Sequence, residues 1–185
     1  MEQGRIGESL EVWQRARELD PLSPLIARVM AYAYLLKRDY SKAQEAFKQS
    51  YDLGPPFIIW GEIEFYIQNG NVSDALAELE RIRKDRSDDP ILIFSEGMAY
   101  ASQGKRAEAL RVIGQLSQMR GSGMSAGIWI ARIYSTLNEK QLALDSMYRA
   151  QEAAAVPHFF KDDPVWDAIR NDQRFEELLK RMAIP

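Results

Sequence analysis

The residues that could carry enzymatic chemistry are few in this chain of 185 residues. It has no cysteine, and His158 is its single histidine. No serine or cysteine motif near His158 would complete a catalytic triad, and we expect this side chain to pack beside Phe159 and Phe160. No general acid–base pair and no activated nucleophile is recognisable elsewhere. We therefore predict that the chain is not an enzyme.

Two further groups of residues have the composition of ligand sites. Asp162, Asp163 and Asp167 carry the oxygen ligands that calcium and magnesium prefer. Their spacing matches no calcium-binding loop, however, and Asp163 is expected to cap a helix that begins at Pro164. The Gly-Ser-Gly segment at 121–123 lacks the strand and the lysine of a phosphate-binding loop, so we interpret it as a linker. No metal and no cofactor are predicted.

The charge and the hydropathy of the chain argue against two classes of partner. The formal net charge is −3, and the basic cluster at 81–86 is interleaved with Glu80 and Asp85, which indicates a solvated helix face. We therefore predict no nucleic-acid partner for this segment. No apolar run approaches the roughly 18 residues of a membrane span, and the chain does not start like a signal peptide. A cytoplasmic location without membrane contact is expected.

The elements that position these side chains follow a repeat of about 34 residues, with one copy slightly shorter. A small residue recurs at Ser9, Ala43, Ala75, Ala109 and Ala143. Four residues later comes a bulkier residue: Trp13, Phe47, Leu79, Ile113 and Met147. Five residues before the small residue comes a turn position: Gly4, Arg38, Gly70, Gly104 and Asn138. The pattern predicts helix pairs whose backbones approach closely, because a large side chain at the small position would force them apart.

Apolar periodicity and capping residues predict where the helices lie. We expect helices at about 4–19, 24–36, 41–53, 57–68, 73–84, 91–103, 106–118, 125–137 and 140–154. Ser41 and Gln44 have the spacing of a capping box at the start of the third helix. The last helix is expected at 173–182, with Asn171 or Asp172 as its cap.

The predicted fold is an all-α, right-handed solenoid of antiparallel helix pairs. Residues 1–157 would form the repeat array, with about four and a half repeats of which the first is truncated. Residues 158–185 would form a short helical C-terminal cap, which covers the open apolar end of the array.

The helix at 4–19 is interpreted as the second helix of a repeat whose first helix is absent. Such a helix would expose an apolar face, in which we expect Ile6 and Trp13. We also expect that the chain is a segment of a longer protein.

These residues resemble the tetratricopeptide repeat (TPR) family over positions 4–154. The second repeat matches with Ala31, Tyr34, Tyr40, Ala43, Phe47 and Pro55. The fourth matches with Gly97, Tyr100, Gly104 and Ala109, and the fifth with Ala131, Tyr134, Ala143, Met147 and Ala150. The third repeat departs from the family, because Ile63 replaces the small residue and Ser87 replaces the late proline. The packing between its two helices is therefore the weakest part of the resemblance.

The C-terminal tail looks like the segment that closes repeat arrays in multidomain bacterial signalling and transcriptional regulatory proteins. The matching residues are Asp163-Pro164, Trp166-Asp167, Ile169-Arg170, Asp172, Arg174-Phe175, Leu178-Leu179, Arg181-Met182 and Pro185. This resemblance implies a larger bacterial regulatory protein, in which the array is coupled to an effector domain.

The TPR resemblance also implies a concave groove, into which the fifth and ninth residues of each first helix point. The fifth residues are Arg28, Trp60, Phe94 and Ile128, and the ninth are Tyr32, Glu64, Met98 and Arg132. Aromatic and arginine side chains dominate binding hot spots, so a peptide or a helix is the expected ligand. Alternatively, these side chains fill the inside of a tightly curved array or meet the C-terminal tail.

The predicted function is a non-enzymatic protein–protein interaction module, a TPR scaffold in a larger bacterial regulatory protein. Two alternatives stay open. In one, the chain is a structural self-association module whose open N-terminal face docks a missing repeat or a second copy as a homodimer. In the other, a small molecule binds in the groove and controls an effector domain.

Overall fold

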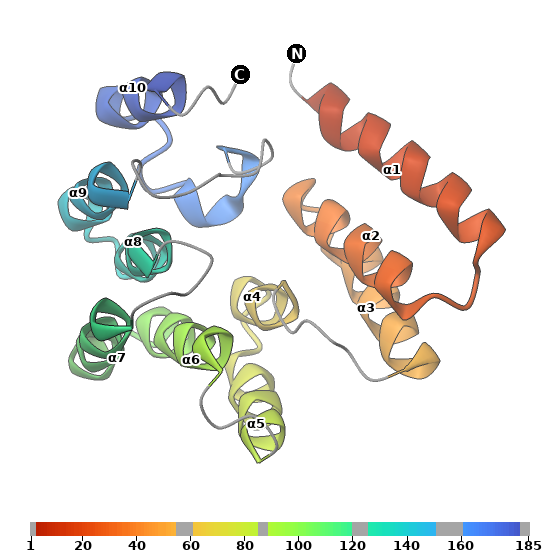
Figure 1. Ribbon diagram of the computed structural model, residues 1–185, viewed down its shortest axis with the longest axis horizontal. Helices are drawn as coiled ribbons and strands as arrows, with labels where there is room; N and C mark the ends of the chain where they lie inside the picture. Colours follow the sequence, from red (N-terminus) through yellow and green to blue (C-terminus); the bar gives the residue numbers. More distant parts are fainter. Residues whose placement is uncertain (1–2, 55–60, 85–88, 120–125, 151–160, 182–185) are drawn as a thin grey trace. The chain divides into compact units, whose positions relative to one another are not determined.

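The computed structural model describes residues 3–54, 61–84, 89–119, 126–150 and 161–181. All the regular secondary structure in these ranges is helical, and none of it is a strand (Figure 1). The helices are α1 (Gln3–Leu19), α2 (Pro24–Leu36), α3 (Tyr40–Leu53), α4 (Glu62–Gln68), α5 (Val72–Arg83), α6 (Pro90–Ser102), α7 (Arg106–Gln118), α8 (Ala126–Thr136), α9 (Lys140–Ala150), the 3-10 helix η2 (Pro164–Trp166) and α10 (Gln173–Arg181). The predicted all-α, TPR-like fold with a short helical cap is confirmed.

The chain divides into two compact units, at residues 1–70 and 71–185. The division falls in the turn between α4 and α5, so the two helices of the third repeat belong to different units. The expected boundary between array and cap at 157/158 lies outside the described residues, as do the Gly-Ser-Gly segment, His158 and Trp60.

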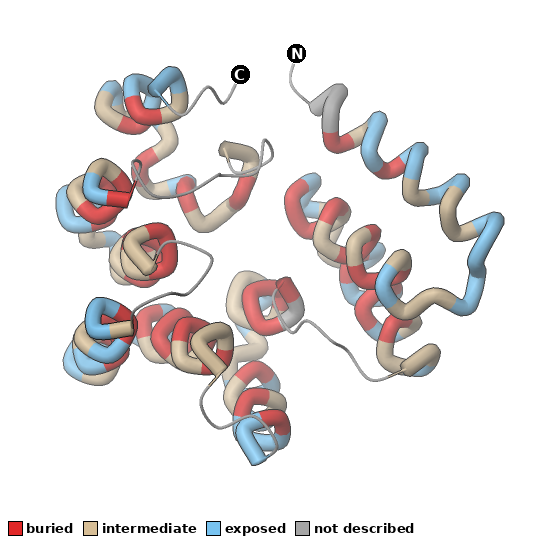
Figure 2. The backbone as a smooth tube through the Cα atoms, viewed as in Figure 1, coloured by how far each residue is buried: buried red, intermediate tan, exposed pale blue. Residues whose placement is uncertain are grey.

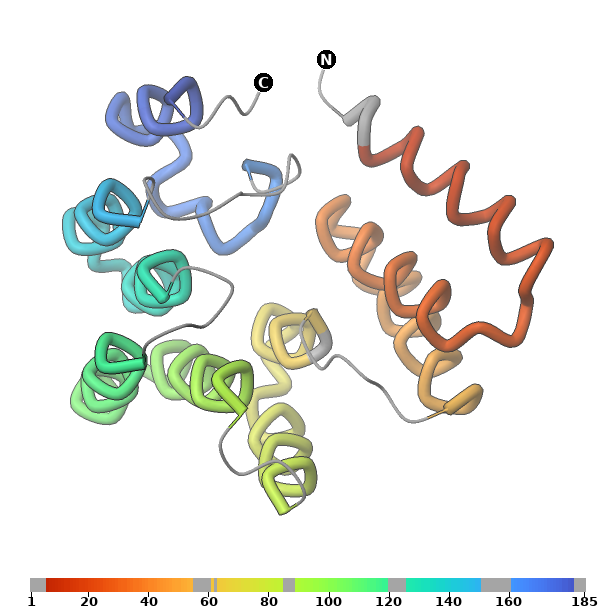
Figure 3. Tube along the Cα trace, viewed as in Figure 1, coloured from red at the N-terminus to blue at the C-terminus, as the bar shows by residue number. Residues whose placement is uncertain are grey.

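The N-terminal unit is built around the pair α2 and α3, which run in opposite directions (Figure 3). Their interface buries Ala31, Leu35, Ala43 and Phe47, and the Phe47 ring lies 5.4 Å from the ring of Phe65 on α4. Small residues on both helices permit this close approach, because they leave room for the facing backbone.

Helix α1 covers the other side of α2. Its side chains Ile6 and Leu10 pack against Ala33 and Leu36 and are buried there. Ile6 was expected in an open apolar face, and this expectation is wrong because α2 covers the face on which Ile6 lies. Trp13 is half-buried.

The C-terminal unit contains the pairs α6–α7 and α8–α9, whose helices lie side by side (Figure 1). Gly97 of α6 shows how close the helices come. A Cβ atom at Gly97 would lie 2.8 Å from Cγ1 of Val112 on α7 and 2.6 Å from Cδ1 of Ile133 on α8. The small residue that the repeat places here is therefore a steric requirement.

The cap belongs to the core of the C-terminal unit. Trp166 of η2 and Phe175 and Leu178 of α10 are buried in one cluster with Ala143 and Met147 of α9. Asp163 caps η2, as predicted, by accepting a hydrogen bond from the backbone N–H of Val165 at 2.9 Å.

The structure also shows which residues cap α10 and α3. The Asp172 carboxylate accepts from the N–H of Arg174 at 2.9 Å at the start of α10, so Asp172 is the cap there. Ser41 does not cap α3, which begins one residue earlier at Tyr40. Asp39 takes that role by accepting from the N–H of Lys42, since it is the residue directly before the helix.

The turn positions of the repeat share one backbone conformation. Arg38, Gly70, Gly104 and Asn138 all have a positive φ, between 60° and 79°. In the turn after α6, the N–H of Lys105 bonds to the carbonyl of Tyr100, and the N–H of Gly104 bonds to that of Ala101. This left-handed residue ends the first helix of a pair and reverses the chain into the second.

We expect Ala109→Leu to lower the free energy of unfolding by about 1–3 kcal/mol through overpacking, because Ala109 is completely buried in α7. Ala107→Leu is the matched control, since Ala107 is exposed on the same helix. Urea unfolding of both variants tests the crossing, and equal midpoints for the two would contradict it.

We expect alanine substitutions at two glycines, one before α7 and one within it, to change the free energy of unfolding in opposite directions. Gly104→Ala should lower the free energy of unfolding by about 1 kcal/mol, because a side chain disfavours the left-handed conformation of this turn. Gly114→Ala should raise it by about 0.5–1 kcal/mol, because Gly114 lies inside a helix and an added Cβ atom would meet no other element within 4 Å. Thermal melts measure both shifts, and shifts of the same sign would be inconsistent with the assigned turn.

Candidate functional site

Arg28 of the expected groove is buried within the N-terminal unit. Its Nε donates a hydrogen bond to Oγ of Ser50 at 3.3 Å, and this hydroxyl donates to the carbonyl of Pro24 at 2.9 Å. Its guanidinium lies 5.8 Å from the centre of the Tyr51 ring. The side chain thus ties α2 to α3.

The other groove residues of the N-terminal unit differ in exposure. Tyr32 is half-buried and packs against both apolar clusters of the unit. A Cβ atom at Gly61 would lie 2.9 Å from the Tyr32 ring, so a glycine is needed beside it. Glu64 of α4 is buried, and Trp60 lies outside the described residues.

The groove residues of the C-terminal unit are all buried. Phe94 of α6 stacks on Trp129 of α8, with ring centres 5.5 Å apart and planes 16° apart. Met98 accepts a weak hydrogen bond at Sδ from the hydroxyl of Thr136 at 3.6 Å. Ile128 belongs to the core cluster that contains the cap. Within this unit Phe94 and Met98 hold α6 against α8.

Arg132 of α8 binds the C-terminal segment. Its Nη1 lies 2.9 Å from Oδ2 of Asp163, and both side chains are only 3% exposed. The guanidinium also lies 5.7 Å from the Trp166 ring and 5.9 Å from the Phe94 ring, within the range of cation–π attraction. The hydroxyl of Ser135 adds a hydrogen bond to the carbonyl of Val165. A buried ion pair of this kind needs such additional contacts to offset its desolvation.

The expected groove side chains that the structure describes are therefore already in contact with the chain itself. Six of the eight are buried, namely Arg28, Glu64, Phe94, Met98, Ile128 and Arg132. A peptide would reach them only after displacing these internal contacts, so binding through this groove stays a prediction.

The exposed apolar residues lie elsewhere, mainly in the N-terminal unit. Val12 is 62% exposed, Leu19 88%, Leu22 73% and Leu25 55%, whereas Leu142 of the C-terminal unit is 38% exposed. Exposed positions recur along α1 and continue through the turn into α2 (Figure 2). We call the four N-terminal residues the α1–α2 patch. Sequence periodicity did not single out this patch, although the interpretation of residues 4–19 as the second helix of a repeat was a signal for it.

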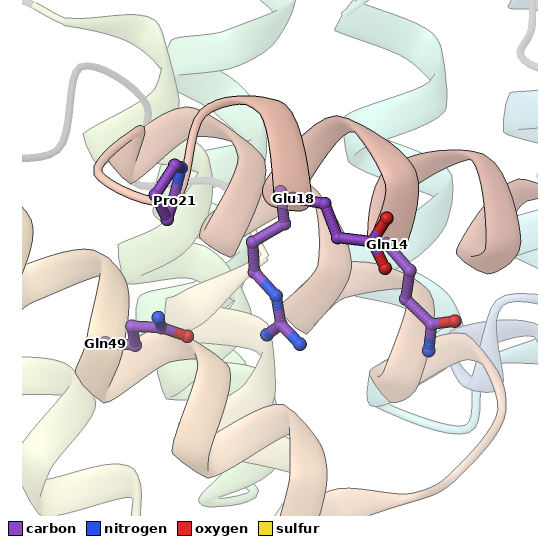
Figure 4. Close-up of a pocket in the computed structure, with 5 residues that line it drawn as sticks. Gln14, Glu18, Pro21 and Gln49 are labelled. Atoms are coloured by element: carbon purple, nitrogen blue, oxygen red, sulfur yellow. The ribbon is translucent and has the colours of Figure 1, made fainter.

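A cavity of about 310 Å³ opens between α1 and α3 (Figure 4). Gln14, Arg17 and Glu18 of α1 line it, together with Pro21 and Gln49. Small-molecule sites are lined mostly by apolar and aromatic side chains, whereas four of these five lining residues are polar or charged. The cavity therefore gives little support to small-molecule sensing.

Electrostatic interactions in the described part of the chain are structural. The hydrogen bond from the Tyr100 hydroxyl to Glu96 raises the pKa of Tyr100. A hydrogen bond to Asp145 likewise raises the pKa of Arg174, which anchors α10 to α9. Asp167 pairs with Arg170 at 3.1 Å. Within the described ranges, no cluster of side chains could hold a metal ion, and no helix is long and apolar enough to cross a membrane.

We expect Arg132→Met to lower the free energy of unfolding by about 3–5 kcal/mol, because it leaves the buried Asp163 carboxylate without its ion-pair partner. Asp163→Asn retains an oxygen for the cap of η2 but removes the charge. In the double variant Arg132→Met/Asp163→Asn the loss should be clearly smaller than the sum of the single losses. Denaturant unfolding of all three measures the coupling, and strict additivity would count against it.

Comparison with known proteins supports the family resemblance over the N-terminal part of the chain. Residues 1–56, which include α1, α2 and α3, match the family described as tetratricopeptide repeat. No curated protein matches the chain. The antiparallel helix pairs, the buried small residues and this match together make the chain similar to the tetratricopeptide repeat family.

Proposed function

We propose that this chain is a non-enzymatic protein–protein interaction module of a larger bacterial regulatory protein. Tetratricopeptide repeats generally mediate protein–protein interactions, and residues 1–56 are similar to them. The resemblance of the tail to the closing segment of multidomain bacterial regulators supports the larger context. The observation that carries the proposal is the α1–α2 patch of Val12, Leu19, Leu22 and Leu25.

The patch has the chemistry of a docking surface. Burying a valine or leucine side chain fully is worth about 1.5–3 kcal/mol, and most of this gain is not realised at four positions between Val12 and Leu25 of the N-terminal unit. Clusters of exposed apolar side chains with polar surroundings mark interaction sites. A partner with an apolar surface would recover this energy.

Binding of a peptide or helix in the concave groove is the second route to the same function. Its cost is the displacement of internal contacts such as those of Arg132 with Asp163. Phe94 is completely buried, so Phe94→Ala would cost about 3–5 kcal/mol of stability and would not report on binding alone. The α1–α2 patch is the more accessible surface, and we place partner binding there first.

The variant Leu22→Ser/Leu25→Ser tests the proposed surface. With the chain as bait in a lysate of its source organism, we expect the proteins captured by the parent to be reduced at least about tenfold, because the variant removes exposed apolar area from the contact. Quantitative mass spectrometry measures the capture.

Leu142→Ser is the control, since Leu142 is an exposed leucine of α9 outside the patch. It should capture the same proteins as the parent. Circular dichroism should show equal helicity for both variants. Unchanged capture by Leu22→Ser/Leu25→Ser would exclude the patch as the binding surface.

A further inference from the structure

Helix α1 has a second stripe of small and apolar residues, apart from the face that packs on α2. Ser9, Val12, Ala16 and Leu19 follow spacings of three and four residues, which places them in one line along the helix. Val12 and Leu19 are 62% and 88% exposed. We call these four residues the α1 stripe. The side chains that hold α1 on α2, Ile6 and Leu10, lie on a different face.

Equivalent positions in the other repeats indicate which kind of contact the α1 stripe can make. Val112 occupies in α7 the position that Val12 occupies in α1, three residues after the small residue of the repeat. Val112 is buried, and its Cγ1 atom would lie 2.8 Å from a Cβ atom added at Gly97, on the helix before it. Ala46 of α3 and Ser146 of α9 occupy the same position and are buried as well. This position of a second helix is thus buried in α3, α7 and α9, and in α7 it contacts the preceding helix.

The charges beside the stripe indicate which helix could cover it. With Ser9, Val12, Ala16 and Leu19 as the a and d positions of a heptad, Glu8 and Arg15 are successive g positions. Both are exposed, and they have opposite charges. The e positions, Ile6 and Trp13, lie on the side that faces α2, where they are buried and half-buried. Only one edge of the stripe therefore carries charges.

We propose that the α1 stripe binds the same stripe of a second copy of this chain, with the two α1 helices antiparallel. In an antiparallel pair the g edge of one helix meets the g edge of the other, so Glu8 of each copy lies beside Arg15 of the partner subunit. In a parallel pair the g edge would meet the e edge, whose residues within α1, Ile6 and Trp13, carry no charge. Charge complementarity thus selects the antiparallel arrangement, which has two-fold symmetry.

The small residues fit this arrangement. In the register that brings Glu8 beside Arg15 of the partner subunit, an a position faces a d position, so Ser9 of one copy lies opposite Val12 of the partner subunit. The small serine does not keep the helices apart. A helix of 17 residues is about 25 Å long, so the interface is at the small end of specific interfaces, below about 1,200 Å² in total. The dimer is accordingly weak and depends on concentration.

This inference rests on the proposed function, since it names a second copy as a partner of the interaction module. The α1–α2 patch and the α1 stripe share Val12 and Leu19. The two residues that are substituted to test the proposed function, Leu22 and Leu25, lie outside the α1 stripe. Loss of partner capture and loss of the dimer can therefore be observed separately.

Sedimentation of the full chain over a wide concentration range tests the inference. The parent should approach twice the monomer mass at high concentration. Glu8→Arg and Arg15→Glu should each weaken the dimer by at least about tenfold, because both cross-subunit pairs become repulsive. The double variant Glu8→Arg/Arg15→Glu should regain parental association, and so should an equimolar mixture of the two single variants.

Val12→Ser/Leu19→Ser should also weaken the dimer at least about tenfold, while Leu142→Ser should leave it unchanged. Equal helicity and melting temperature are expected for all these variants, because the substituted side chains are exposed. A parent that stays monomeric at all concentrations overturns the inference. A dimer that the single charge variants weaken and neither the double variant nor the mixture restores overturns the antiparallel pairing.

If the parent stays monomeric but Leu22→Ser/Leu25→Ser still loses its captured partners, only the second copy as a partner is excluded. If the parent dimerises as described but capture does not depend on Leu22 and Leu25, the α1 stripe stands and the α1–α2 patch is excluded as the surface that binds the captured proteins. The two measurements therefore assign a failure to one proposal or the other.

Discussion

The close crossing of paired helices is the constraint on which the rest of the structure depends. Ala43, Ala109 and Ala143 are completely buried at the positions where the repeat places its small residue. Their size lets neighbouring backbones approach, and larger side chains then pack above and below each crossing. A turn residue with a positive φ brings the second helix back along the first. One small residue and one turn residue thus set the geometry of each repeat.

The same constraint explains where apolar surface stays exposed. A face that is small and apolar packs well only against another helix, and this face is buried in α3, α7 and α9, which pack against their preceding helices. In α1 the corresponding face, with Val12 and Ala16, carries the residue types of such a contact and is exposed to half-buried. The exposed leucines at the end of α1 and the start of α2 extend this apolar character. Burial of this face against another chain is the interaction that we propose.

In the C-terminal unit the chain itself covers the last helix pair, α8 and α9. The covering segment is 161–181, which places Trp166 in the core and Asp163 against Arg132. An arginine that would suit ligand binding in an open groove serves there as the buried anchor of the cap. The ion pair is stabilised by the aromatic rings around it and by the carboxylate's second role as a helix cap.

The sequence by itself determined the helical repeat, most helix bounds and the caps at Asp163 and Asp172, because these depend on periodicity and on contacts between near neighbours. Even there, Asp39 rather than Ser41 caps α3, since two polar residues within one turn compete for the same role. Only the tertiary structure decided that Ile6 is buried while Val12 is exposed, and that Phe94 and Arg132 face the chain's own helices and cap. Burial depends on which distant segment covers a face, and local spacing carries no record of that partner.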